Sequence, residues 1–132
     1  MFHLGKRSKN RLNGVHPDLV RVVKRAIEIT ETDFTVLEGL RSLDRQAALL
    51  RLGQSKTMKS RHLTGHAVDL AAMVNGVISW QPDHYMPIAR AMKHAAAELG
   101  IKLEWGGDWR TFKDFVHWQL SWQVYPAKDE TH

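Results

Sequence analysis

The chain has 132 residues, of which 43% are hydrophobic and 25% are charged, so its composition is typical of one globular domain and not of a disordered chain. It contains no cysteine, which excludes disulfide frameworks, thiolate nucleophiles and cysteine-ligated zinc sites and leaves eight histidines, with Asp and Glu, as metal ligands. Lys and Arg number 19 against 14 Asp and Glu, and the formal net charge of +5 favours an anionic partner of unspecified kind.

The N-terminal segment is basic, with Lys6, Arg7, Lys9 and Arg11, but no apolar stretch follows it as in a signal peptide. The sequence also contains no run of 18 apolar residues, the length that would predict a transmembrane helix. We therefore expect synthesis in the cytoplasm and no stable membrane insertion. For residues 1–13 the sequence leaves two interpretations open, a mobile, solvated basic arm and an arm with a binding role.

Three elements are predicted in the first half of the chain. Apolar residues recur at helical spacing over residues 17–29, and Pro17 suits the first turn of that helix. Residues 33–40 are partly β-branched, which predicts a strand. Ser42 is a suitable N-cap for a helix over residues 43–52, and residues 53–65 are expected to form a loop.

In the second half, Asn75-Gly76 lies between two apolar runs, a strong signal for a β-hairpin. The other predicted elements are a helix from its N-cap Asp83 to Leu99 and strands at residues 101–105 and 116–123. Because helices and strands are interspersed and a hairpin pairs its strands antiparallel, we predict a single α+β domain with a mainly antiparallel sheet flanked by helices.

Two histidines and an aspartate lie close together in the segment Ser-Arg-His-Leu-Thr-Gly-His-Ala-Val-Asp, residues 60–69. As a helix, this segment would place His62, His66 and Asp69 on one face. As a loop followed by a strand, it would keep His62 and Asp69 as metal ligands and turn His66 to the opposite face. We favour the strand, because Gly65 interrupts the segment and the Asn-Gly hairpin follows it.

A third ligand must come from elsewhere, and Asp-Phe-Val-His-Trp, residues 114–118, supplies a carboxylate three positions before a histidine. If His117 binds the metal, Asp114 can reach the water that the metal activates. A metal ion lowers the pKa of bound water to about 7, and a nearby carboxylate can take its proton and pass it to a leaving amine.

These two segments resemble the two signatures of the M15-type zinc peptidases. Ser60, His62, Gly65, Ala67 and Asp69 match the pattern S-x-H-x-x-G-x-A-x-D, and DFVHW resembles the second signature. The family includes D-alanyl-D-alanine peptidases and the L-alanyl-D-glutamate endopeptidases that serve as phage endolysins. The likeness to compact endolysins extends over most of the chain, through HPDLVRVV, DFTVLEGLRS, RQAALL and GGDWRTFKDFVHW.

The resemblance implies a fold of the D-Ala-D-Ala peptidase and hedgehog type, with one zinc ion (Zn2+) per chain. It implies His62, Asp69 and His117 as the metal ligands and Asp114 as general base and acid. Many members carry Glu where this chain has Asp114, and the shorter side chain requires the reacting water to lie closer to the backbone.

Other site residues also follow from the resemblance. It places Arg41 near the scissile carbonyl or a substrate carboxylate, where a guanidinium stabilises a developing oxyanion. Ser60 is expected either to contact substrate or to support the His62 loop. Trp105 is assigned to substrate binding, with Asp108 and Trp109 as further candidates to line the cleft, although burial in the core is the commoner environment for such tryptophans.

The function implied is that of a zinc-dependent peptidoglycan endopeptidase, a phage endolysin that hydrolyses the L-Ala–D-Glu bond of the stem peptide. We expect a monomer that waits in the host cytoplasm and reaches the wall from the periplasm once the membrane is permeabilised. The alternatives are a D-Ala-D-Ala carboxypeptidase or dipeptidase of the same family and a non-catalytic, zinc-stabilised wall-binding module. No nucleic-acid-binding signature is present, so we expect no nucleic-acid partner.

Overall fold

The computed structural model describes residues 1–55 and 60–126. Over these residues an antiparallel sheet of five strands has the order β1-β2-β5-β4, and β3 pairs with β2. The strands are β1 Asp33–Glu38, β2 Ala67–Val74, β3 Val77–Ser79, β4 Leu103–Trp105 and β5 His117–Leu120. The helices are α1 Lys6–Arg11, α2 Pro17–Ile29, α3 Leu43–Arg51 and α4 Met86–Leu99, with 3-10 turns η1 Arg61–Thr64, η2 Pro82–His84 and η3 Gly106–Asp108. The predicted α+β class is confirmed.

The first two predicted helices begin where the sequence indicated. Pro17 is the first residue of α2, and His16 caps it by accepting a hydrogen bond from the Asp18 amide at Nδ1, over 3.1 Å. Ser42 caps α3 by accepting a hydrogen bond from the Arg45 amide at its hydroxyl, over 3.0 Å.

The start of α4 was predicted wrongly. Asp83 lies in the separate 3-10 turn η2, and α4 begins at Met86 with no side-chain cap. The Tyr85 hydroxyl donates a hydrogen bond of 2.7 Å to the Ser79 carbonyl, which ties this turn back to β3. The end of α4 at Leu99 agrees with the prediction.

The hairpin of β2 and β3 is confirmed. Asn75 and Gly76 both adopt positive φ, 53° and 81°, and Val74 pairs with Val77 across the turn. The two last strands are shorter than predicted, since β4 starts at Leu103 and β5 ends at Leu120. The predicted loop over 53–65 contains the turn η1, and its residues 56–59 lie outside the described part of the chain.

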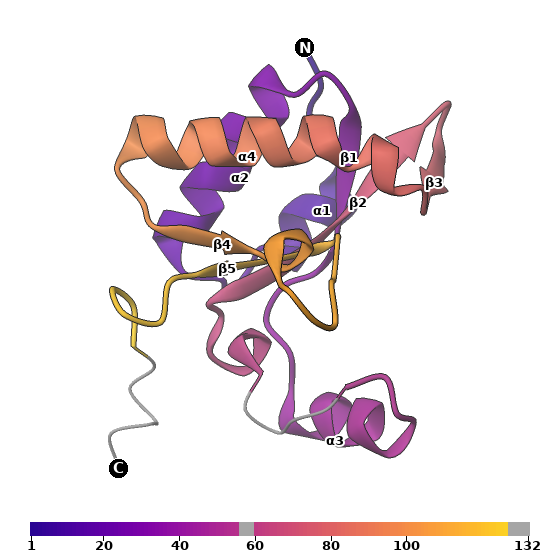
Figure 1. Ribbon diagram of the computed structural model, residues 1–132, viewed down its shortest axis with the longest axis vertical. Coiled ribbons are helices and arrows are strands. Elements are labelled where there is room, and N and C mark those ends of the chain that lie inside the picture. Colours follow the sequence, from indigo (N-terminus) through magenta and orange to yellow (C-terminus); the bar gives the residue numbers. More distant parts are fainter. Residues whose placement is uncertain (56–59, 127–132) are drawn as a thin grey trace.

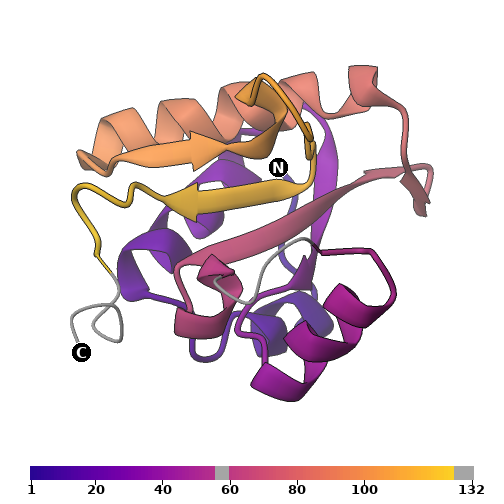
Figure 2. The same ribbon diagram turned by 60° about the horizontal axis from the view of Figure 1, so that its bottom comes forward.

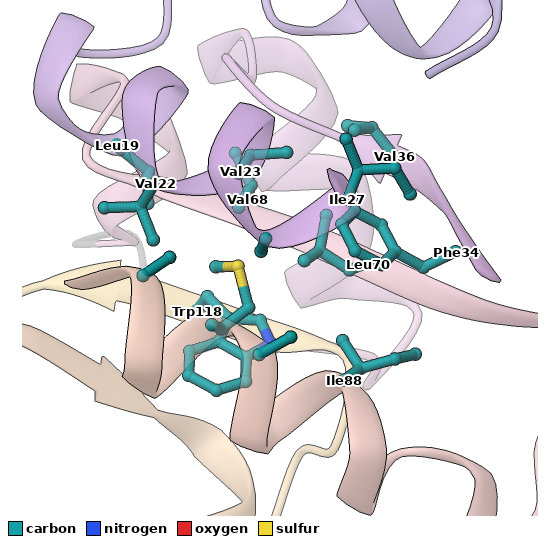
Figure 3. Packing of buried hydrophobic residues seen from close by; sticks show 14 of the residues in the cluster. Leu19, Val22, Val23, Ile27, Phe34, Val36, Val68, Leu70, Ile88 and Trp118 are labelled. Carbon is teal, nitrogen blue, oxygen red and sulfur yellow. The ribbon is translucent and has the colours of Figure 1, made fainter. Parts of the chain in front are cut away.

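The two faces of the sheet differ in chemistry. Val68, Leu70 and Trp118 belong to the buried apolar face, which α2 and α4 cover, and Figure 3 shows these side chains packed with those of the helices. In Figure 1, α4 crosses α2 on this side, whereas α3 lies at the opposite end of the molecule, and the turned view in Figure 2 shows the same separation of α4 from α3. Because side chains alternate along a strand, Asp69 and His117 point to the other face.

The basic N-terminal segment is not a free arm. Residues 6–11 form α1, and Leu4, Ser8 and Leu12, spaced four apart, are buried. The Ser8 hydroxyl lies 2.9 Å from the Thr35 hydroxyl and accepts a hydrogen bond from the Val36 amide over 3.0 Å. The interpretation of residues 1–13 as a mobile arm is therefore corrected, because one side of this segment is apolar or hydrogen-bonded to β1 while its lysines face solvent.

The N-terminal segment also contacts the residues around η1. Gly65 has φ +76°, and a Cβ built on it would lie 2.3 Å from the Gly14 carbonyl oxygen, so a side chain at position 65 would collide with the backbone. Next to this contact, the His16 amide donates a hydrogen bond of 2.8 Å to the Gly65 carbonyl. The glycine of the first signature is therefore a site of close approach between two segments.

No helix in the described ranges combines the length and the apolar character that a membrane crossing requires.

Candidate active site

Three polar side chains lie in a row across the polar face of the sheet. Asp69 on β2 pairs with Glu38 on β1 on one side and with His117 on β5 on the other. The register of β1 shifts between Val36 and Glu38, and this bulge brings Glu38 opposite Asp69, although Val36 belongs to the buried face. The sheet thus fixes the spacing of two carboxylates and one imidazole.

His62 reaches this row from η1. Ser60 caps that turn by accepting a hydrogen bond of 3.2 Å from the His62 amide. The chain just after β1 holds His62 from the other side, because the Arg41 amide donates to the His62 carbonyl over 2.9 Å and the His62 Nδ1 donates to the Gly39 carbonyl over 2.9 Å. The ring therefore presents Nε2 to Asp69.

His62, Asp69 and His117 each offer one ligand atom, and these atoms all lie within 4.8 Å of one another. Asp69 Oδ1 is 3.1 Å from His62 Nε2 and 3.3 Å from His117 Nδ1. Such a set of two imidazoles and one carboxylate suits a metal ion that keeps a position open for water or substrate.

The orientation of the two rings supports this interpretation. His62 Nδ1 donates to Gly39, and His117 Nε2 donates to Oε1 of Gln119 over 2.8 Å. Neutral rings held in this way direct a lone pair from their other nitrogen toward the Asp69 carboxylate. Two lone pairs and a carboxylate need a cation between them, so the residues present fit a metal ion.

The ionisation of Asp69 and His117 depends on this contact when a proton, and not a metal ion, lies between the rings and the carboxylate. Burial would raise the pKa of Asp69, but hydrogen bonds from the facing ring nitrogens of His117 and His62 then hold it well below its usual range. Burial would lower the pKa of His117, but the hydrogen bond and charge of Asp69 raise it overall. Asp69 is thus a carboxylate at neutral pH, the form in which it can bind a metal.

Asp114 lines the same cavity from the segment that precedes β5. Burial and the nearby negative charge of Asp69 raise the pKa of the Asp114 carboxyl group. Its backbone is fixed against η3, because the Asp114 amide donates to the Gly106 carbonyl over 3.0 Å. A Cβ built on Gly106 would lie 2.4 Å from the Asp114 carbonyl oxygen, so this contact requires glycine.

The cavity has a volume of about 780 Å³ and contains six predicted polar site residues, namely Arg41, Ser60, His62, Asp69, Asp114 and His117. Asp108, a further candidate, does not line it and instead pairs with Lys93 over 2.8 Å. The Arg41 side chain is 9% exposed and pairs with Glu38. Its NH1 donates to Oε1 of Gln46 over 2.7 Å, and its NH2 lies 3.8 Å from Oδ2 of Asp69. Arg41 therefore stands at the edge of the ligand cluster, already held by two neighbours.

Trp105 lies in the core and not in the cleft. It is 5% exposed, its Nε1 donates to the Phe115 carbonyl over 2.9 Å, and its ring stacks on Trp118 at a centroid distance of 5.4 Å. It does not line the cavity, so its expected role in substrate binding is corrected to one in the core. Trp109 does line the cavity, and its ring centroid is 5.3 Å from that of His117.

His66 stands apart from the ligand cluster, as the alternation along a strand predicted. Its Nδ1 lies 2.7 Å from the Thr64 hydroxyl, and its ring is 5.5 Å from that of His16. Burial, followed by the charges of Arg61 and His16, lowers the pKa of His66 to about 4.

Glu38, Gln46 and Gln119 were missed by the sequence analysis, although each contacts a predicted site residue. Gln119 could have been found, because it lies two positions after His117 on one strand and hence on the same face. Glu38 could not, because its orientation depends on the bulge in β1. Gln46 gave no signal, since its partners Arg41 and Ser55 lie outside α3, one before the helix and one after it.

Comparison with known proteins places this chain in a family. The family model described as phage L-alanyl-D-glutamate peptidase matches residues 1–119. The chain belongs to this family. It is 37% identical over 118 residues to the L-alanyl-D-glutamate peptidase of Escherichia phage T5, and the match covers 86% of each chain.

Solved structures agree with the sequence comparisons. The L-Ala D-Glu endopeptidase ChiX of Serratia marcescens has a TM-score of 0.89 and 54% identity, with 92% of each chain covered. The vancomycin resistance D,D-dipeptidase VanXYg, solved with a D-Ala-D-Ala phosphinate analogue, has a TM-score of 0.53 and 18% identity, over 80% of this chain and 50% of its own. The second likeness shows a shared fold and so confirms the predicted resemblance in fold alone.

Proposed function

We propose that this chain is a zinc-dependent endopeptidase that hydrolyses the L-Ala–D-Glu bond of the peptidoglycan stem peptide, with residues 1–132 as its catalytic domain. The observation that carries the proposal is the convergence of His62, Asp69 and His117 beside Asp114 in one open cavity. Membership of the phage L-alanyl-D-glutamate peptidase family supports the choice of bond.

In this proposal the zinc ligands are His62 through Nε2, His117 through Nδ1 and the Asp69 carboxylate. When bound, zinc supplies a Lewis acid that polarises the scissile carbonyl and makes water more acidic. Asp114 removes a proton from the attacking water and returns it to the departing amine of D-Glu. Its raised pKa suits both transfers, because a proton carrier works best when its pKa lies close to the working pH.

Arg41 is the proposed stabiliser of the negative charge that develops on the carbonyl oxygen. Glu38 and Gln46 fix its guanidinium before substrate arrives, so little reorganisation is needed during the reaction. For Ser60 we favour support of the His62 loop over substrate contact, because its hydroxyl already accepts a hydrogen bond from the His62 amide.

Two alternative functions predict other products of the stem peptide, or no product at all. A D-Ala-D-Ala carboxypeptidase or dipeptidase would release D-Ala, and the likeness to VanXYg in fold is compatible with such an enzyme. A wall-binding module with a structural zinc would close the site with a fourth ligand. Within residues 1–55 and 60–126, the cluster at this site contains three ligand residues, which favours catalysis.

The test combines product analysis with matched variants. Purified muropeptides are incubated with the zinc-loaded chain, and mass spectrometry identifies the severed bond. We expect His117→Ala to abolish zinc binding and hydrolysis, and Asp114→Asn to retain zinc while losing most activity. His94→Ala and Asp83→Asn, at exposed positions outside the cavity, serve as controls.

Each outcome addresses a separate part of the proposal. Release of free D-Ala would replace the proposed bond specificity with that of a D,D-peptidase. Near-normal hydrolysis by Asp114→Asn would remove the general base. In a second assay, the turbidity of a suspension of permeabilised cells is followed with and without a metal chelator. Clearance that is insensitive to the chelator would rule out a metal-dependent enzyme.

We further propose that the chain acts as a monomer, without a nucleic-acid partner, after a separate protein opens the membrane and lets it pass from the host cytoplasm to the wall. The net charge of +5 would then favour approach to an anionic envelope. Lytic activity that falls steeply with added salt would support this role for the charge, and a flat response would oppose it.

A further inference from the structure

Three consecutive residues, Phe112, Lys113 and Asp114, all line the active-site cavity. An extended segment could not do this, because its side chains point alternately to opposite sides. Phe112 adopts φ +53°, an uncommon value for a residue with a side chain, and this turn in the backbone breaks the alternation. The contact between Gly106 and Asp114 closes the loop at its base, so Lys113 is held next to Asp114 in the same wall of the cavity.

Lys113 differs from the arginines that line the cavity. Arg41 and Arg45 both pair with Glu38, and Arg61 is buried, with its NH2 donating to main-chain carbonyls. Lys113 is exposed, and its ammonium group donates one hydrogen bond, of 3.3 Å, to the Gly107 carbonyl. Among the residues that the structure describes, no carboxylate lies within ion-pair distance of Lys113.

The proposed substrate carries an anion that this cation could bind. D-Glu is joined to the next residue of the stem peptide through its γ-carboxyl group, so its α-carboxylate remains free. That carboxylate is attached to the carbon that bears the leaving nitrogen. Since Asp114 is proposed to protonate this nitrogen, a cation next to Asp114 lies on the side of the cavity where the α-carboxylate must lie.

We propose that Lys113 binds the α-carboxylate of D-Glu and makes the enzyme selective for stem peptides with D-Glu over those in which this group is amidated to D-isoglutamine. The inference rests on the proposed function and adds a residue that determines specificity. A lysine suits this role, because its flexible ammonium group acts as a point charge toward an anion.

The experiment compares two soluble muropeptides that differ in this carboxylate or amide alone. For the wild-type chain we expect kcat/KM to be about threefold to tenfold higher for the D-Glu substrate, the range for a partly exposed charged contact. Lys113→Met should bring the ratio of the two kcat/KM values close to one, and Lys113→Arg should restore the preference. Lys24→Met, on the exposed side of α2, removes the same charge outside the cavity and should leave the ratio at the wild-type value.

The ratio separates failure of this inference from failure of the proposed function. A wild-type chain that cleaves both substrates equally well would overturn the inference while leaving the endopeptidase in place. If the preference for the D-Glu substrate survives in Lys113→Met, Lys113 does not cause it and the inference is overturned. If Lys113→Met cleaves both substrates less well but to the same extent, the inference is overturned too, because Lys113 then has a role other than selectivity. A wild-type chain that is zinc-loaded but cleaves neither substrate would refute the proposed function and this inference together.

Discussion

His117 and Gln119 are joined by a hydrogen bond of 2.8 Å in which Nε2 of the ring donates to the amide oxygen Oε1. This bond leaves Nδ1 of His117 as the nitrogen that faces Asp69. Gln119 therefore selects the tautomer whose Nδ1 lone pair faces Asp69, which is the form that the proposed metal site requires.

Replacement of Gln119 should consequently weaken metal binding. We expect Gln119→Ala to lower zinc affinity about 10- to 100-fold, because the ring loses its fixed orientation. Gln119→Glu keeps an acceptor at this position and should bind zinc much more tightly than the alanine variant. Competition with a chromophoric chelator measures the affinities, and equal values for wild type and Gln119→Ala would contradict the prediction.

Arg61 should be important for stability. It is 3% exposed, its NH2 donates to the carbonyls of Leu120 and Tyr125 over 3.0 and 2.6 Å, and its guanidinium lies 4.0 Å above the Trp122 ring. We expect Arg61→Met to lower the free energy of unfolding by about 2–4 kcal/mol, because buried carbonyls lose their donor. Urea denaturation measures this loss.

A matched arginine provides the control for that experiment. Arg21 is exposed and lies 3.4 Å from Asp18, so Arg21→Met should change the free energy of unfolding by less than about 0.5 kcal/mol. Equal effects of the two substitutions would show that the contacts of Arg61 do not stabilise the fold.

The positions of two tryptophans predict opposite phenotypes. Trp105→Phe removes a hydrogen bond and part of a stacked pair in the core, and should cost about 1–3 kcal/mol of stability while kcat/KM per folded molecule stays within about twofold. Trp109→Ala should mainly reduce kcat/KM, because Trp109 lines the cavity beside His117. Thermal unfolding and muropeptide hydrolysis distinguish the two effects, and an activity defect confined to Trp105→Phe would reverse the assignment.

His66 should make stability depend on pH. The pKa of His66 is about 4 in the folded chain and 6.5 in the unfolded chain. As the pH falls, the unfolded chain therefore binds a proton at His66 before the folded chain does. The contribution of neutral His66 is complete above pH 6.5 and is lost between about pH 6.5 and 4. Allowing for the partial exposure of the ring, we expect a loss of about 1–2 kcal/mol.

A difference measurement isolates this effect. Denaturation of the wild type and of His66→Gln is compared at several pH values, so that the pH dependence of the proposed metal site is common to both. As the pH falls, the free energy of unfolding of the wild type should decrease more than that of His66→Gln. A difference between the two free energies that is independent of pH would count against the shifted pKa.

The sequence predicted the parts of the fold and site that depend on local patterns. The alternation of side chains along the predicted strand separated Asp69, on β2, from His66, which precedes β2, and the Asn-Gly turn placed the hairpin correctly. Local patterns also identified the caps of α2 and α3.

The features that the sequence did not predict depend on contacts between distant segments. Glu38 faces Asp69 because of a bulge in β1, and the burial of Trp105 depends on its stacking against Trp118. Residues 1–13 were assigned from their charge, whereas the burial of Leu4, Ser8 and Leu12 requires the surface of β1. The bulge in β1 and the stacking of Trp105 on Trp118 have no signal within a short window of sequence.

The contact between Gly65 and Gly14 limits how enzymes of this kind can be recombined. The backbone around the first signature is shaped to fit the turn before α2, so the two segments must be exchanged together when chimaeras are built from related endolysins. A graft of residues 60–69 alone onto a relative with a bulkier turn before α2 should shift His62 out of register with Asp69, even if every ligand residue is present.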